Sequence, residues 1–172
     1  MATGKTSAAK EVARKLGRRY VSTDDLIVEK SKKTVAQIFY EEGEEVFRKK
    51  EVNTVEEVSK MRDVVIDCGG GVVKNRVNID RLKQNGIIFL LKAEFDAILE
   101  RNSKQEGKRP LLMAGGGTEE IRRMFNFRDP LYENSADYVI DTTELSVEEV
   151  AEKVTEIVRK SCGIGASKSK KK

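Results

Sequence analysis

The sequence predicts an α/β fold in which helices cover a mainly parallel sheet, built as a single domain from 172 residues. Three observations support this prediction. Helix and strand patterns alternate along the chain, a short apolar segment leads within two residues to three consecutive glycines, and no apolar run approaches the ~20 residues that a membrane-spanning helix needs. Hydrophobic residues make up 38% and charged residues 36%, the balance of an ordinary globular domain. We therefore expect no membrane partner.

The first third of the chain contains one strand pattern among several helix patterns. Gly17 ends an Ala-rich helix, and Gly43 separates a short helix from a longer, highly charged one. Asp24 is placed to cap a helix, and Thr34 with Gln37 has the spacing of a capping box. In order, the expected elements are a helix over 7–16, a strand over 20–22, and helices beginning near 24, near 34 and after 43, the last one running toward 60.

The rest of the chain supplies the other strands. Residues 64–66 form a compact apolar strand that runs into an aspartate, a cysteine and three glycines. Ser146 with Glu149 has the spacing of a second capping box. The further elements expected are strands over 87–91 and 138–140, a helix over about 94–101, a polar, glycine-containing loop reaching 117, and an amphipathic helix from 146.

The formal net charge of +4 arises at the C-terminal end, because four lysines lie among the last five residues. Without these lysines the chain has 29 basic and 29 acidic residues. We therefore expect residues 163–172 to be a basic, disordered tail on a neutral domain spanning 1–162, and we expect no nucleic-acid partner.

The composition excludes several kinds of chemistry. The chain has no histidine, which rules out a Ser-His-Asp or Cys-His mechanism and a His-ligated zinc site. A general base must then be a carboxylate, a lysine, a tyrosine or a thiolate. The two cysteines are too few for a disulfide framework and lack metal-ligand spacing, so we expect a reduced, cytoplasmic protein.

Gly4-Lys5-Thr6, at the start of the first helix, matches the end of the phosphate-binding motif G-x-x-x-x-G-K-S/T. Backbone amides at a helix N-terminus bind phosphate oxygens, the lysine reaches the β- and γ-phosphates of ATP, and the threonine hydroxyl binds Mg²⁺. Taken alone, the fragment is also that of an ordinary helix start. The candidate ATP-binding residues here are Ala2, Thr3, Gly4, Lys5, Thr6 and Ser7, with Thr6 as a metal ligand.

Five further segments occur in the order and spacing of a known family. They are Ser22-Thr23-Asp24, Phe47-Arg48, Gly69-Gly70-Gly71, Arg109-Pro110-Leu111-Leu112, and Arg128-Asp129-Pro130-Leu131-Tyr132. They resemble, in turn, the D-T-D motif, the Phe-Arg pair, the G-G-G loop, the lid motif and the R-x-P-x-Y segment of shikimate kinases. The resemblance covers about residues 2–160. It implies a P-loop α/β/α fold, with ATP as co-substrate and Mg²⁺ as cofactor, and transfer of the γ-phosphoryl group to a shikimate hydroxyl, giving shikimate 3-phosphate.

The resemblance also implies roles for individual residues. Arg48 and Arg128 would hold the shikimate carboxylate, because the planar fork of arginine suits a carboxylate. Asp24 would accept hydrogen bonds from the ring hydroxyls and take the proton of the one that is phosphorylated. Gly69, Gly70 and Gly71 would let the substrate approach the backbone. The candidate catalytic residues are Lys5, Asp24 and Arg109.

Two regions of the expected fold would close around the substrates. A small helical region over about 24–60 would bind shikimate, and a glycine-flanked lid over about 103–117 would bring Arg109 to the transferring phosphoryl group. Arg101 would stack on adenine, and Thr142 with Thr143 lies where the family has its adenine-contacting loop. By the same resemblance we expect a monomer.

The sequence departs from the family pattern in two places. Ser22 stands where the family has an acidic residue that helps to hold the water shell of Mg²⁺. Asp67, two residues before the triple glycine, is the carboxylate that we expect to take over this role; otherwise it caps a strand end. The chain also begins inside the phosphate loop, so the hydrophobic strand that leads into such a loop is missing, and we expect a start site placed too late.

Other interpretations stay open at this point. Three glycines are also typical of a flexible turn, an isolated arginine of a solvated face, and a segment such as 103–117 of a surface loop. A neighbouring enzyme would be a P-loop kinase for gluconate or a nucleoside monophosphate, although paired arginines favour a compact carboxylated polyol. Ser22 and the missing strand also suit a catalytically inactive binding protein, which Mg²⁺-dependent ATP turnover would distinguish.

Overall fold

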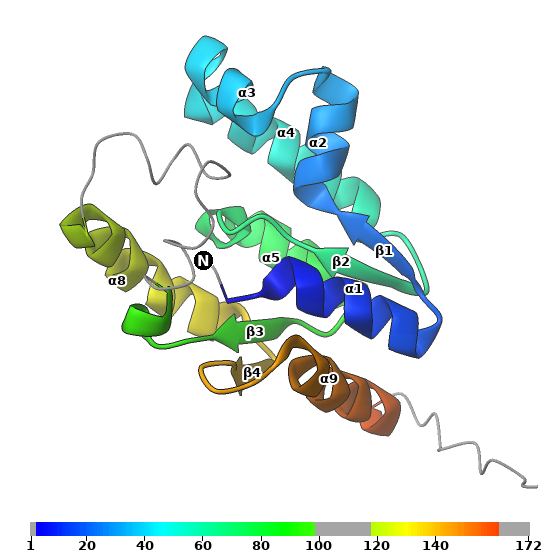
Figure 1. The fold of residues 1–172 in the computed structure, drawn as a ribbon. Coiled ribbons are helices and arrows are strands. Elements are labelled where there is room, and N and C mark those ends of the chain that lie inside the picture. The colour runs from blue at the N-terminus through cyan, green and yellow to red at the C-terminus, as the bar shows by residue number, and fades with distance from the viewer. Residues whose placement is uncertain (1–2, 99–117, 162–172) are drawn as a thin grey trace, which may run out of the picture.

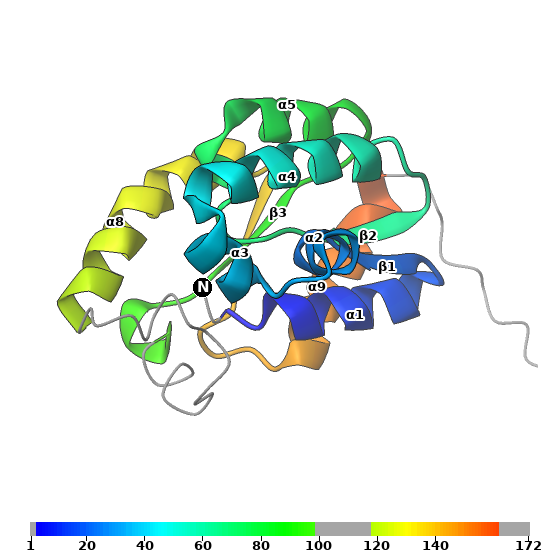
Figure 2. The same ribbon diagram turned by 90° about the horizontal axis from the view of Figure 1, so that it is seen from above.

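The structure is a computed structural model that describes residues 3–98 and 118–161. Its strands lie between two layers of helices, with α1 and α9 on one side and α4 and α5 on the other (Figure 1 and Figure 2). This arrangement is the predicted α/β fold. In chain order the elements are α1 (Lys5–Leu16), β1 (Arg19–Ser22), α2 (Thr23–Ser31), α3 (Val35–Glu41), α4 (Gly43–Val58), β2 (Val64–Asp67), the 3₁₀ turn η1 (Val72–Lys74), α5 (Arg76–Asn85), β3 (Phe89–Lys92), α8 (Thr118–Ser135), β4 (Tyr138–Asp141) and α9 (Val147–Ser161).

The described strands form two parallel pairs. β1 pairs with β2 in a register that sets Ser22 opposite Asp67, and β3 pairs with β4 in a register that sets Lys92 opposite Asp141. The arrows of both pairs point toward the same end of the molecule (Figure 1). The residues that follow these strands therefore gather at one edge, where ligands of α/β proteins commonly bind.

Most of the predicted helix boundaries are confirmed. Gly17 ends α1 in the left-handed conformation with a φ of 62°, and Gly43, with a φ of 85°, separates α3 from α4. Both predicted capping boxes form, at Thr34 with Gln37 and at Ser146 with Glu149. In each box a side chain satisfies a backbone N–H that the helix itself leaves without a partner.

Three details of the prediction are wrong. α2 is capped by Ser22, whose hydroxyl accepts a hydrogen bond from the backbone N–H of Asp25 at 3.1 Å, so Asp24 lies inside the first turn instead of capping it. β3 begins two residues later than predicted, at Phe89, because the backbone of Ile88 bonds to Asp137 ahead of β4. The sequence patterns also missed α8, an 18-residue helix with a proline inside it.

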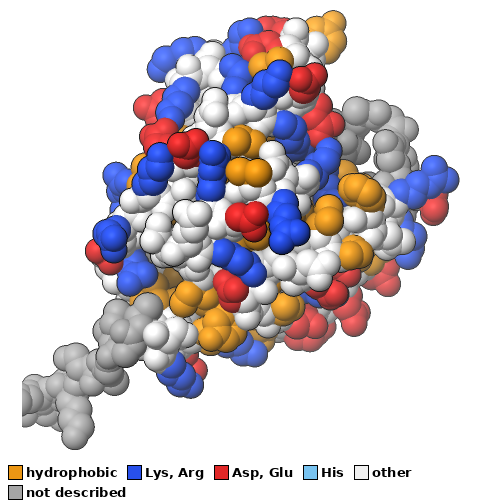
Figure 3. Space-filling view, turned by 180° about the vertical axis from the view of Figure 1, so that it is seen from behind, with side chains coloured by type: hydrophobic (Ala, Val, Ile, Leu, Met, Phe, Trp, Pro, Cys, Tyr) orange, Lys and Arg blue, Asp and Glu red, His pale blue; other side chains and the backbone are white. Residues whose placement is uncertain are grey.

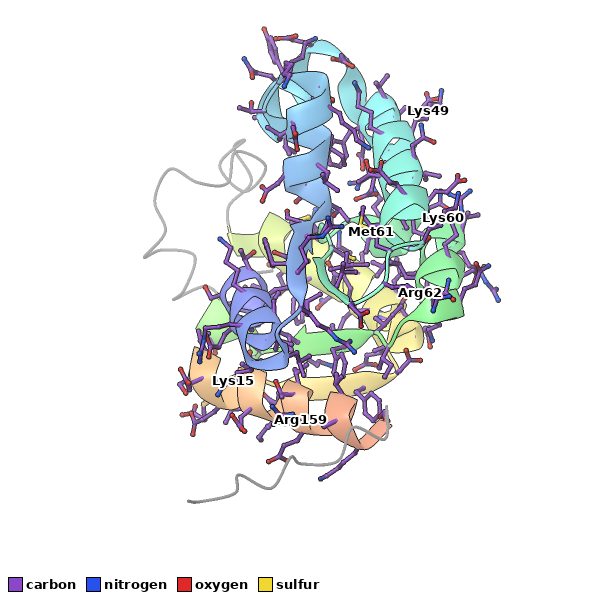
Figure 4. The ribbon with its side chains drawn as sticks, turned by 90° about the vertical axis from the view of Figure 1, so that its right-hand side faces the viewer. Lys15, Lys49, Lys60, Met61, Arg62 and Arg159 are labelled. Carbon is purple, nitrogen blue, oxygen red and sulfur yellow. The ribbon has the colours of Figure 1, made fainter. Side chains whose placement is uncertain are left out.

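Separate apolar clusters hold the layers together. The largest packs α1 and α9 against the strands through Val12, Ile140, Ala151, Val154 and Val158. At the far end of the same helices, Lys15 and Arg159 lie beside each other (Figure 4), and the Arg159 guanidinium donates to the Lys15 carbonyl at 3.4 Å. These contacts fix α1, whose first turn carries the phosphate-binding motif, against the C-terminal helix.

A second cluster stabilises the region that projects beyond the sheet. Ile27 of α2, Ile38 of α3 and Phe47 of α4 are buried against one another, and these three helices rise above β1 in Figure 1. The ring of Phe39 packs against that of Phe47 at 4.7 Å between ring centroids, with the ring planes tilted by 40°. The assignment of residues 24–60 as a substrate-binding region stays a prediction.

A cavity of about 1230 Å³ extends between the two strand pairs and reaches the glycines that follow β2. Among the described residues no strand lies between β2 and β3, so these two strands face each other across the cavity without pairing.

The surface mixes charges of both signs. On the face seen in Figure 3, lysine and arginine side chains are interspersed with aspartate and glutamate, and small apolar patches lie between them. Within the described ranges, no helix has the length and apolar character needed to cross a membrane.

Candidate active site

The start of α1 meets the end of β2 through an ion pair. Gly4 has a φ of 78°, a left-handed conformation that favours glycine, and it turns the chain into α1. The ammonium group of Lys5 pairs with one carboxylate oxygen of Asp67, and the Tyr20 hydroxyl donates to the other at 3.0 Å. The Asp67 side chain is only 4% exposed, so these two groups replace much of the water that its carboxylate loses.

The residues around Asp67 also suit a magnesium ion. Thr6 lies in the first turn of α1, and Asp67 is the last residue of β2. Their hydroxyl and carboxylate oxygens are the hard donors that Mg²⁺ prefers. Within the described residues, no group of three or more His, Cys, Asp or Glu side chains forms a metal cluster. Mg²⁺ in phosphoryl-transfer sites is usually held by one or two protein groups together with substrate phosphates, so the donor set present fits that kind of site.

Thr23 connects β1 to the triple-glycine segment. Its hydroxyl is buried, donates to the carbonyl of Asp67 at 3.4 Å and accepts from the backbone N–H of Gly69 at 2.9 Å. Thr23 therefore holds the triple-glycine segment in place beside the end of β2.

The side chains of Asp24 and Arg48 lie close to the backbone of Gly69 and Gly71. A Cβ at Gly69 would stand 2.5 Å from a carboxylate oxygen of Asp24, and one at Gly71 would stand 2.1 Å from the Arg48 guanidinium. Such separations are far below any van der Waals contact, so a side chain at either position would displace a candidate substrate-binding group. The three segments predicted separately to bind shikimate thus meet in one place.

Two glutamates hold the guanidinium of Arg48. Glu51 accepts from Nη1 at 3.0 and 2.9 Å, and Glu44 accepts from Nε and Nη2 at 3.1 Å each. Glu51 is 1% exposed, and this burial raises the pKa of its carboxyl group, although Arg48 opposes the rise. Glu44 also accepts from Lys74, and that hydrogen bond lowers its pKa. Arg48 is therefore oriented by protein groups on two sides.

α8 brings the last predicted segment to the same cavity. The Tyr132 hydroxyl donates to the carbonyl of Gly70 at 2.6 Å, which joins α8 to the triple glycine. Arg128, one turn earlier on α8, lines the cavity together with Asp24, Arg48 and the glycines. Both candidate arginines therefore border one space.

Thr142 and Thr143 follow β4 at the same edge of the sheet. The Thr142 hydroxyl is fully buried, donating to the carbonyl of Lys92 at 3.0 Å and lying 3.4 Å from the carbonyl of Thr3. Thr143 donates to Asp141 at 2.6 Å and accepts from the N–H of Glu94 at 3.1 Å. The two threonines thus tie β3, β4 and the phosphate-binding segment together.

Some predicted site residues lie outside the described residues. They are Ala2, Arg101, Arg109 and the lid over 103–117, and so is the tail over 163–172. Burial raises the pKa of the Cys68 thiol to about 12, which leaves this neighbour of the site without a usable thiolate.

Sequence reasoning missed three residues of the site. Glu44 and Glu51 lie four residues before and three residues after Arg48, a spacing that places all three on one face of a helix. That signal was available once Arg48 was singled out. Tyr20 gave no comparable signal, because its contact with Asp67 joins strands 47 residues apart.

The comparisons with known proteins agree with this geometry. A family model described as shikimate kinase matches residues 1–159. The chain belongs to the shikimate kinase family. Its activity is accordingly the ATP-dependent phosphorylation of a shikimate hydroxyl, which makes it a phosphotransferase with ATP as co-substrate.

Relatives and solved structures in this family cover nearly the whole chain. The shikimate kinase of Caldanaerobacter subterraneus subsp. tengcongensis is 44% identical over 154 residues, covering 90% of this chain and 89% of the relative. A shikimate kinase of Caldicellulosiruptor saccharolyticus is 43% identical over 157 residues, covering 91% and 90%. The structure of shikimate kinase from Acinetobacter baumannii in complex with shikimate is 31% identical, with a TM-score of 0.86, and covers 94% of this chain and 89% of that one.

Proposed function

We propose that the chain transfers the γ-phosphoryl group of ATP to the 3-hydroxyl of shikimate with the residues gathered at the ends of β1 and β2. One observation carries the proposal. Asp24 and Arg48 lie so close to Gly69 and Gly71 that a Cβ at either glycine would force the neighbouring side chain to move. That packing leaves a carboxylate and a guanidinium facing one cavity, which suits an acceptor with hydroxyls and a carboxylate.

Arg48 and Arg128 bind the shikimate carboxylate. A guanidinium binds a carboxylate through two parallel hydrogen bonds, and Glu51 and Glu44 already hold Arg48 in a fixed orientation. A group that is oriented before the substrate arrives loses less entropy on binding. Arg128 reaches the same space from α8.

Asp24 orients the hydroxyl that attacks the phosphoryl group. Its carboxylate lies at the start of α2 beside Gly69 and lines the cavity. With no histidine in the chain, a carboxylate next to the substrate is the group best placed to accept the hydroxyl proton.

The start of α1 binds the phosphates. The first backbone N–H groups of a helix lack partners within it and attract anions, and Lys5 adds a positive charge at this point. Phosphoryl transfer depends mainly on positioning and on neutralising charge, so Lys5, and Arg109 from the lid, would supply much of the rate. Arg101, Thr142 and Thr143 would bind the adenosine part.

Thr6 and Asp67 would hold Mg²⁺, with Asp67 acting on the water shell of the ion. When bound, the ion would supply positive charge that neutralises the phosphates. Asp67 lies opposite Ser22 in the strand register, so it places a carboxylate next to the position where the family pattern expects one. Lys5 pairs with the same Asp67 carboxylate.

The protein acts on these small molecules as a cytoplasmic monomer without a nucleic-acid partner. The mixed charge on the face seen in Figure 3 supports the last part of this proposal for that face, since nucleic-acid sites carry a continuous basic patch. The oligomeric state is measurable by light scattering at the concentrations used for the assay.

Product analysis tests the proposed function. The protein is incubated with Mg-ATP and equimolar shikimate, gluconate and AMP, and phosphorus NMR follows new phosphoryl resonances. We expect a phosphomonoester of shikimate alone. A phosphorylated gluconate or AMP product would assign the site to a different acceptor, and ATP binding without any product would favour an inactive binding protein.

A further inference from the structure

One carboxylate oxygen of Glu44 is shared by two positively charged side chains. Glu44 Oε1 accepts from Arg48 Nε and Nη2 at 3.1 Å each and from Lys74 Nζ at 2.5 Å. The bond from Lys74 is the shortest of the three, and it is also the largest cause of the lowered pKa of Glu44. Lys74 therefore holds the carboxylate that in turn holds Arg48.

Lys74 reaches Glu44 from the segment that follows the triple glycine. It is the last residue of η1, and its backbone N–H donates to the carbonyl of Gly71 at 2.9 Å. Glu44 lies 30 residues earlier, in the first turn of α4. The ion pair thus joins the helix that carries Arg48 to the segment that carries the glycines.

The charges around Arg48 balance only when Lys74 is included. Arg48 and Lys74 each carry one positive charge, and the ionised carboxylates of Glu44 and Glu51 each carry one negative charge. Burial raises the pKa of Glu51, and the positive charge of Lys74, like that of Arg48, opposes this rise. Without Lys74, two negative charges would face one positive charge, which disfavours an anion beside Arg48.

We propose that Lys74 is a positioning residue for the carboxylate of the acceptor: it holds and neutralises Glu44, and this leaves the charge of Arg48 available to an anion. The inference rests on the proposed function, because it takes Arg48 as the group that binds the shikimate carboxylate. Among the described residues, Arg48 lines the cavity, whereas Lys74 and Glu44 do not. Lys74 therefore acts through Glu44 and not by touching the substrate.

Lys74→Met tests the proposal, because methionine keeps the length of the side chain and removes its charge. Lys74→Arg keeps the charge and is the conservative variant. Lys49→Met is the matched control. Lys49 follows Arg48 directly on α4 (Figure 4) and pairs with Glu45 at 2.8 Å, but these two side chains are 72% and 83% exposed. For each variant, kcat and the KM values for shikimate and ATP are measured.

We expect Lys74→Met to raise KM for shikimate ~3- to 10-fold, with kcat and KM for ATP changed less than about twofold, since binding and not the chemical step is affected. Lys74→Arg should restore most of the lost affinity, and Lys49→Met should change all three values less than about twofold. An unchanged KM for shikimate in Lys74→Met would overturn the proposal.

A double-mutant cycle tests whether Lys74 acts through Glu44. In the Glu44→Gln background, Lys74→Met should change KM for shikimate less than about twofold, because the negative charge that Lys74 balances is already gone. An equal rise of KM in both backgrounds would show that Lys74 acts independently of Glu44, and the proposal would be wrong.

A measurement without substrate separates this inference from the proposed function. Proton–nitrogen NMR follows the Nε–H resonance of Arg48, which is assigned with Arg48→Lys. We expect Lys74→Met to shift this resonance in the wild-type background and to leave it in place in the Glu44→Gln background. No shift, or the same shift in both, contradicts the coupling. The expected shifts together with no shikimate-dependent turnover would refute the proposed function and still support the link from Lys74 to Arg48.

Discussion

Arg48 shows how much of this site depends on the surroundings of a single side chain. Its guanidinium lies between Glu51 and Glu44, near the rings of Phe39 and Phe47, and against the backbone of Gly71. Each contact limits where the planar group can point. The affinity for substrate that we assign to Arg48 therefore depends on all of these neighbours together.

Gly71→Ala tests this close packing. The added Cβ would stand 2.1 Å from Arg48, so the arginine must move and its contact with the substrate carboxylate weakens. We expect KM for shikimate to rise ~10- to 100-fold, with KM for ATP nearly unchanged. Gly70→Ala is the matched comparison, because its Cβ would stand 3.4 Å from the Tyr132 hydroxyl. Equal effects of the two substitutions would contradict the account.

Glu51→Gln tests the buried carboxylate through the pH dependence of stability. Burial raises the pKa of Glu51 above its usual 4.5. Between pH 4.5 and this raised pKa, the folded chain therefore binds more protons than the unfolded chain. The free energy of unfolding therefore loses the Glu51 contribution as pH rises from about 4.5. We expect the free energy of unfolding of the wild-type chain to decrease relative to that of Glu51→Gln as pH rises over this range. Urea unfolding at a series of pH values measures both.

Glu44→Gln is the control for the previous prediction, because its shift has the opposite sign. Lys74 and Arg48 lower the pKa of Glu44, so its contribution is present above the usual value and is lost as pH falls. The free energy of unfolding of the wild-type chain, relative to that of Glu44→Gln, should thus decrease as pH falls, the reverse of the Glu51 case. A pH-independent difference for Glu51→Gln would contradict its assigned burial.

At the scale of elements, the register of β1 and β2 sets Ser22 opposite Asp67, so mutation can move the carboxylate from one strand to the other. Asp67→Ser should raise the Mg²⁺ concentration for half-maximal turnover by ~10-fold or more, because the water shell of the ion loses a charged partner. Ser22 lies directly opposite, so the double change Ser22→Asp with Asp67→Ser returns the carboxylate to the neighbouring strand. We expect it to regain most of the lost Mg²⁺ affinity, measured also by Mg²⁺-dependent ADP binding. An unchanged Mg²⁺ requirement in Asp67→Ser would remove Asp67 from the metal site.

The capping box of α3 gives a prediction of stability. The Thr34 hydroxyl accepts from the N–H of Gln37 at 3.2 Å, while the Gln37 side chain accepts from the N–H of Thr34 at 2.8 Å. Thr34→Ala should lower the free energy of unfolding by about 1 kcal/mol, whereas Thr34→Ser should cost much less because it keeps the hydroxyl. Urea unfolding measures both. Equal losses would show that the methyl group, not the cap, stabilises the helix.

The sequence predicts elements well where a local signal marks their ends. Gly17, Gly43 and the two capping boxes act within a few residues, and the structure has each of them. α8 was missed because Pro130 lies inside it, and proline normally ends a helix. Ser22 as the cap of α2 was missed because Asp24 carries the same local signal two residues later.

At the scale of the whole molecule, the order of the motifs predicted which segments meet. Asp24, Arg48, Arg128 and the triple glycine line one cavity, as the sequence led us to expect. The contacts of Tyr20 with Asp67 and of Thr142 near Thr3 could not be predicted, because they join residues 47 and 139 positions apart through strand neighbours. Such contacts depend on the packing of complete elements.

Helix α1 packs against both strand pairs. Val12 belongs to a cluster that includes Val65 of β2 and Phe89 and Leu91 of β3, while α9 packs against the same helix. The two strand pairs are therefore connected through the helices that pack against them. These contacts also place Lys5, in the first turn of α1, at the end of β2.

The central claim is that this site transfers phosphate from ATP to shikimate. The measurement that tests it most directly is ADP release from Mg-ATP at increasing shikimate concentrations. We predict release that saturates with shikimate and exceeds the shikimate-free rate by at least ~100-fold. Release that does not depend on shikimate, or no release, would contradict the account.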